Sequence, residues 1–62
     1  METGAFEHRG VWYGFTTEMV DTDYGGERLV RFFLDAELIA RYQEPASTET
    51  IIRWFKESLD ES

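Results

Sequence analysis

The chain has 62 residues and a formal net charge of −7, from 13 acidic and six basic residues. Its length is well below the roughly 100 to 200 residues of a usual domain, so we expect residues 1–62 to fold as one small domain with a thin core. The absence of cysteine excludes disulfide and thiol chemistry. The negative charge argues against nucleic acid or a membrane surface as partner, because both are usually negative themselves.

The first expected element is a strand over about residues 10–19. The segment GVWYGFTTEM is rich in aromatic and β-branched residues, and two sets of side chains alternate along it. The following segment, DTDYGG over residues 21–26, combines Asp with Gly, and both residues favour tight turns. The chain is therefore expected to reverse direction there.

Residues 27–43 fit two periodicities. As a helix, the segment places apolar residues at three- and four-residue spacing and ends before Pro45. As a hairpin, it gives strands over about residues 28–34 and 38–43 with a turn that begins at Asp35. We expect the hairpin because two consecutive Phe residues beside Val are poor helix formers, and the helix is the alternative.

The last expected element is an amphipathic helix over about residues 48–59. Ser47 or Thr48 can cap its first N–H groups, and Glu49 lies in the first turn, where the helix dipole favours negative charge. Its apolar residues fall on one face at helical spacing, and they are Ile51, Ile52, Phe55 and Leu59.

These elements predict an α+β fold, in which a three-stranded antiparallel sheet is covered on one face by the C-terminal helix. Alternation along the strands assigns to the covered face Val11, Tyr13, Phe15, Val30, Phe32, Leu34, Leu38, Ala40 and Tyr42. The other face is rich in apolar side chains, although no element is left to cover it. We therefore expect an interaction surface there, made of Trp12, Leu29, Arg31, Phe33, Ile39 and Arg41.

No group of residues has the sequence spacing of a catalytic, cofactor or metal site. His8, the one histidine, lies between Glu7 and Arg9 with no nucleophile close to it in the sequence. Residues 21–32 resemble a calcium-binding loop at three positions, but Phe32 stands where the closing Glu should be. We therefore expect a protein without enzymatic activity, cofactor or metal ion.

The sequence thus favours a small acidic protein-interaction module that forms a homodimer through the uncovered sheet face. The absence of cysteine and of a basic, apolar leader also leads us to expect a cytoplasmic protein. One alternative is an acidic mimic of nucleic acid, which inhibits a nucleic-acid-binding protein through its spaced carboxylates.

A second alternative is a sheet-face nucleic-acid binder that uses Trp12, Arg31 and Arg41. The order of three strands followed by a helix resembles that of integrase arm-binding domains, in which residues of the sheet face contact the major groove. The resemblance lies in the order of elements and not in any motif, so only the fold implies this mode of binding.

Overall fold

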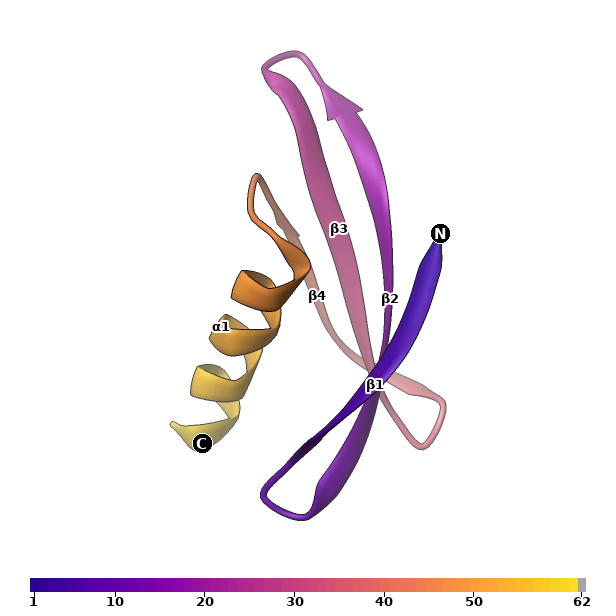
Figure 1. Ribbon diagram of the computed structural model, residues 1–62, viewed down its shortest axis with the longest axis vertical. Coiled ribbons are helices and arrows are strands. Elements are labelled where there is room, and N and C mark those ends of the chain that lie inside the picture. Colours follow the sequence, from indigo (N-terminus) through magenta and orange to yellow (C-terminus); the bar gives the residue numbers. More distant parts are fainter. Residues whose placement is uncertain (62) are drawn as a thin grey trace.

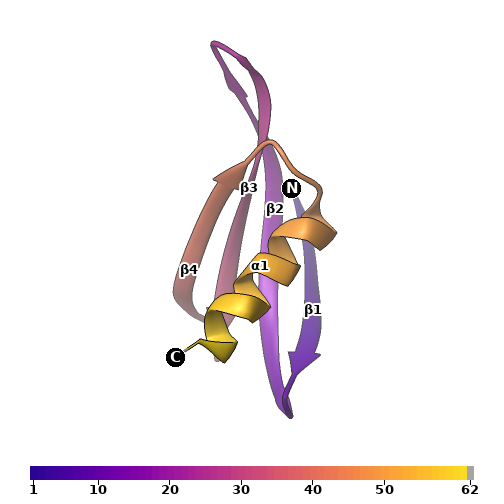
Figure 2. The same cartoon turned by 90° about the vertical axis from the view of Figure 1, so that its left-hand side faces the viewer.

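The computed structural model describes residues 1–61 as one antiparallel sheet followed by a helix (Figure 1). The strands lie side by side in chain order, and they are β1 (Glu2–His8), β2 (Val11–Thr22), β3 (Gly25–Leu34) and β4 (Glu37–Glu44). Helix α1 (Thr48–Asp60) runs diagonally across one face of the sheet (Figure 2). Residues 27–43 thus belong to the β3–β4 hairpin and not to the alternative helix.

The expectation of a three-stranded sheet is wrong, because Glu2–His8 forms a fourth strand at the edge. Its sequence gives little strand signal, since Gly and Ala occupy its centre and both are depleted in strands. The strand is stabilised by its neighbours, and the ring of Phe6 stacks on that of Tyr13 with centroids 5.6 Å apart. The turn that joins it to β2 has positive φ at Arg9 (52°) and Gly10 (81°), as a two-residue turn of type I′ requires.

The core lies between α1 and the sheet face that it covers. Phe32 and Phe55 stack at its centre, with ring centroids 4.0 Å apart and an angle of 6° between the rings. Ser47 caps the helix by accepting a hydrogen bond from the backbone N–H of Thr50 (3.2 Å). The buried apolar cluster is small and consists of Val30, Phe32, Ile51 and Phe55.

A β-bulge in β4 changes which of its side chains face the core. Phe32 pairs with Ala40, whereas Phe33 pairs with Leu38, so Ile39 is an extra residue on β4. Cross-strand partners point to the same side of a sheet. Leu38 therefore shares the face of Phe33, away from α1, and the expectation that Leu38 lies on the covered face is wrong.

Candidate interaction surface on the open face of the sheet

Within residues 1–61, no element covers the sheet face opposite α1, which we call the open face (Figures 1 and 2). Strand alternation and the register place on it the odd-numbered residues of β1 and β3 and the even-numbered residues of β2. The β4 residues whose partners lie on this face are Leu38, Arg41 and Gln43. Two rows of side chains cross all four strands here.

The first row, which we call the apolar row, consists of Ala5, Gly14, Phe33 and Leu38. Leu38 is 50% exposed, and Phe33 beside it is half-buried. On β1 and β2 the row is low, because a Cβ atom added at Gly14 would have no neighbour nearer than the carbonyl oxygen of Gly4, at 3.9 Å. The row therefore rises from small residues on β1 and β2 to large ones on β3 and β4.

The second row, which we call the arginine row, consists of Thr3, Thr16, Arg31 and Arg41. Arg31 donates a hydrogen bond from Nη1 to Oε1 of Glu18 (3.2 Å). Arg41, directly opposite Arg31, is exposed and has no hydrogen-bond or ion-pair partner in the described part of the chain. This row also rises from small residues on β1 and β2 to large ones on β3 and β4.

Trp12 extends the apolar surface beside the apolar row, and Ile39 is exposed at the bulge next to it. Trp12 is 64% exposed and lies on β2 two residues before Gly14, opposite Glu7 of β1. Ile39, the bulge residue beside Leu38, is 42% exposed. Large apolar side chains in contact with water at one end of a sheet face are typical of a surface that a partner covers.

Leu29 lies on the open face as expected, but it is only 5% exposed. Its cross-strand neighbours are Glu18 and Gln43. Glu18 is bound to Arg31, and Gln43 donates a hydrogen bond to Glu27 (3.1 Å), so polar side chains enclose Leu29. The structure thus places four of the six expected residues on the open face in exposed or half-buried positions: Trp12, Arg31, Phe33 and Arg41. Ile39 is exposed at the bulge, and Leu29 is buried.

Sequence reasoning missed Ala5, Gly14 and Leu38 as parts of this surface. Ala5 belongs to the strand that was not expected, and Leu38 was placed on the wrong face because the bulge has no sequence signal. Gly14 has no side chain, and it contributes to the surface by leaving open space above β2.

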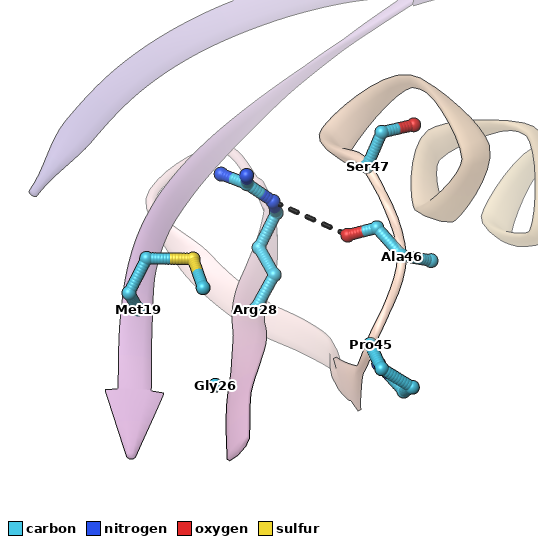
Figure 3. A pocket seen from close by; sticks show the side chains of 6 residues that line it. All are labelled: Met19, Gly26, Arg28, Pro45, Ala46 and Ser47. Atoms are coloured by element: carbon cyan, nitrogen blue, oxygen red, sulfur yellow. Dashed lines mark hydrogen bonds between the residues drawn. The ribbon is translucent and has the colours of Figure 1, made fainter.

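The β2–β3 hairpin extends beyond the rest of the sheet as an arm, residues 19–27 (Figure 1). A hollow of about 260 Å³ lies at its root, where Arg28 donates a hydrogen bond from Nε to the carbonyl oxygen of Ala46 (3.3 Å; Figure 3). This contact joins the root of the arm to the segment before α1. The residues that line the hollow are Met19, Gly26, Arg28, Pro45, Ala46 and Ser47.

His8 acts with Arg9 in holding the end of α1. His8 Nε2 and Arg9 Nε both donate hydrogen bonds to Oδ1 of Asp60, each over 2.7 Å. The hydrogen bond from Arg9 is the main cause that lowers the pKa of the Asp60 carboxyl, and the hydrogen bond from His8 is the second. The bond between Arg9 and Asp60 also raises the pKa of Arg9. The geometry around the one histidine is thus that of a structural contact between the β1–β2 turn and the helix.

Among the residues that the structure describes, no three His, Asp or Glu side chains gather as a metal site requires. In the same part of the chain, helix α1 lacks the length and apolar character needed to cross a bilayer. Comparisons with protein-family models, curated proteins and solved structures find no match to this chain.

Proposed function

We propose that the protein is a non-enzymatic protein-interaction module that self-associates through its open face. The observation that carries this proposal is the apolar row with Trp12 beside it, left in water on a sheet whose other face is already covered by α1. Exposed apolar surface of this kind is costly unless a partner removes it from water.

The size of the open face is adequate for a small interface. Four strands spaced by about 4.8 Å and about eight residues long give a face of roughly 20 by 25 Å, so stacking two faces buries on the order of 1,000 Å² in total. This area is near the lower limit for a specific interface. Burial of its apolar part at about 25 cal/mol per Å² would supplement a core that consists of few fully buried side chains.

The charges on the open face favour a protein partner over nucleic acid. Arg31 is bound to Glu18, and the same face carries Glu7 and Glu27, so Arg41 is its one cation without an ion pair in the described chain. A phosphate backbone would meet these carboxylates as well as the arginines.

The test is a charge placed at Leu38, which is half-exposed in the isolated chain and would become buried on association. Leu38→Glu is expected to leave the fold intact and to abolish association, because the interface would bury an unpaired carboxylate. The matched control is Met19→Glu, since Met19 is 60% exposed and lies on the other face of the sheet. Equal effects of the two variants on the mass measured by light scattering, or no association of the unchanged chain, would refute the proposal.

A further inference from the structure

The open face is stepped. On β1 and β2 the two rows present Ala5 and Gly14 in one row and Thr3 and Thr16 in the other, and all four side chains are small or absent. On β3 and β4 the same rows present Phe33 and Leu38, then Arg31 and Arg41. Within these two rows the β1–β2 half is thus low and the β3–β4 half is high, and the step runs along the strands between β2 and β3. Trp12 stands outside the two rows, nearer the start of β2.

A surface of this form is complementary to itself. A two-fold axis parallel to the strands, above the boundary of β2 and β3, places β1 over β4 of the other copy and β2 over its β3. Leu38 then lies over Ala5 of the other copy, and Phe33 lies over its Gly14. Aligned stacking of two sheets, with strand directions within about 30° of each other, is a common packing of sheet on sheet.

The same axis also places the large side chains of the arginine row over small ones. Arg31, already bound to Glu18, then lies over Thr16 of the other copy. Arg41 is on the edge strand β4, so it lies over Thr3 of the other copy at the rim of the interface, where water still reaches its guanidinium group. The threonine hydroxyls can accept hydrogen bonds from both guanidinium groups.

An axis across the strands gives a worse fit. It stacks each strand on the same strand of the other copy, so that Phe33 and Leu38 meet large side chains. Ala5 and Gly14 then face the same small residues of the other copy across a gap. Unfilled space loses dispersion contacts, and overpacking forces side chains out of their rotamers. Only the axis along the strands fills the low half of one face with the high half of the other.

We infer that the partner of the open face is a second copy of this chain, joined by a two-fold axis parallel to the strands that seats Phe33 and Leu38 of each copy over Gly14 and Ala5 of the other. This inference rests on the proposed self-association and adds the arrangement of the two copies. It makes Ala5 and Leu38 direct partners across the interface, although they lie on opposite edges of their own sheet.

The test exchanges the sizes of these two residues. Ala5→Leu fills the low half and Leu38→Ala empties the high half, and each is expected to raise the dissociation constant of the dimer at least about tenfold. The double variant Ala5→Leu/Leu38→Ala again stacks one Leu on one Ala, and its dissociation constant is expected to return to within about threefold of the original. Circular dichroism of each variant at a concentration where it is monomeric checks that the fold is kept.

The control is Ala5→Leu combined with Ile39→Ala. It removes similar apolar volume beside Leu38, but from a residue outside the apolar row, so it is expected to leave the dissociation constant raised. If the unchanged chain dimerises and Leu38→Glu disrupts the dimer, but the Ala5/Leu38 exchange does not restore affinity, this arrangement is wrong while the proposed function stands. If the unchanged chain is monomeric at every concentration, both fail.

Discussion

The ring of Phe15 lies against the backbone of Gly4, its cross-strand partner, so closely that a Cβ atom at residue 4 would be 2.5 Å from Cζ of Phe15. The ring covers the part of the edge strand where a side chain is lacking, which lets a strand with weak propensity join the sheet. A side chain at residue 4 would therefore displace the Phe15 ring from the edge strand.

We predict that Gly4→Ala lowers the free energy of unfolding by about 1 to 3 kcal/mol, because the Phe15 ring must leave its position. Gly14→Ala is the matched control, since its new Cβ atom would have no neighbour nearer than 3.9 Å. Both changes are best made in the Leu38→Glu background, where dimerisation does not contribute. Thermal unfolding that shows equal effects of the two substitutions would contradict the packing role of Gly4.

The sequence predicted those elements whose signals are local. The helix expected at residues 48–59 spans Thr48–Asp60, because a capping serine and apolar residues at helical spacing define it without reference to the sheet. The turns near Asp23 and Asp35 were likewise marked by residues that favour turns.

Features that depend on tertiary contacts could not be predicted. Strand β1 forms because Phe6 joins the aromatic cluster, which overrides the poor strand propensity of its own residues. The bulge at Ile39 moves Leu38 to the open face, and a shift of one residue reverses the face of every side chain before it. Leu29 is buried among polar neighbours that are joined by two hydrogen bonds, and no pattern of apolar residues reveals these.

Removal of the Phe55 ring from the core should strongly lower the free energy of unfolding. We predict that Phe55→Ala costs about 3 to 5 kcal/mol, because the ring is 3% exposed and stacks on Phe32. That cost is comparable to the whole stability of a core this small, so the isolated monomer should be largely unfolded by circular dichroism. Trp54→Ala is the control, since Trp54 is 37% exposed on the same helix and should lose far less.

The contact of Asp60 with Arg9 and His8 should make stability depend on pH in the acidic range. The pKa of Asp60 is lowered in the folded chain, so the contact stabilises the fold above the ordinary pKa of an Asp carboxyl and is lost as the pH falls through the folded-state value. Asp60→Asn should therefore reduce the fall in melting temperature between neutral and acidic pH.

The matched control for this change is Asp21→Asn, because Asp21 is exposed and has no ion-pair or hydrogen-bond partner among residues 1–61. The control should preserve the pH dependence of the unchanged chain. Identical pH profiles for the two variants would show that Asp60 does not stabilise the end of α1.

Binding to duplex DNA should be weak. A net charge of −7 repels phosphate, and Arg31 is already bound to Glu18, so we expect no dissociation constant below the nonspecific range of about 10⁻⁴ to 10⁻⁶ M at physiological salt. Fluorescence anisotropy with a labelled duplex measures this directly. Tighter binding that weakens steeply as salt is added would instead support a sheet-face nucleic-acid binder.

In the proposed dimer, the open face is covered by a second copy of the chain. Sedimentation equilibrium of the unchanged protein, from low to high micromolar concentration, tests it most directly. The mass is expected to rise with concentration towards twice the 7.3 kDa of one chain and no further, because an isologous interface closes at two copies. A mass that stays at 7.3 kDa throughout, or one that continues to rise beyond the dimer, would contradict it.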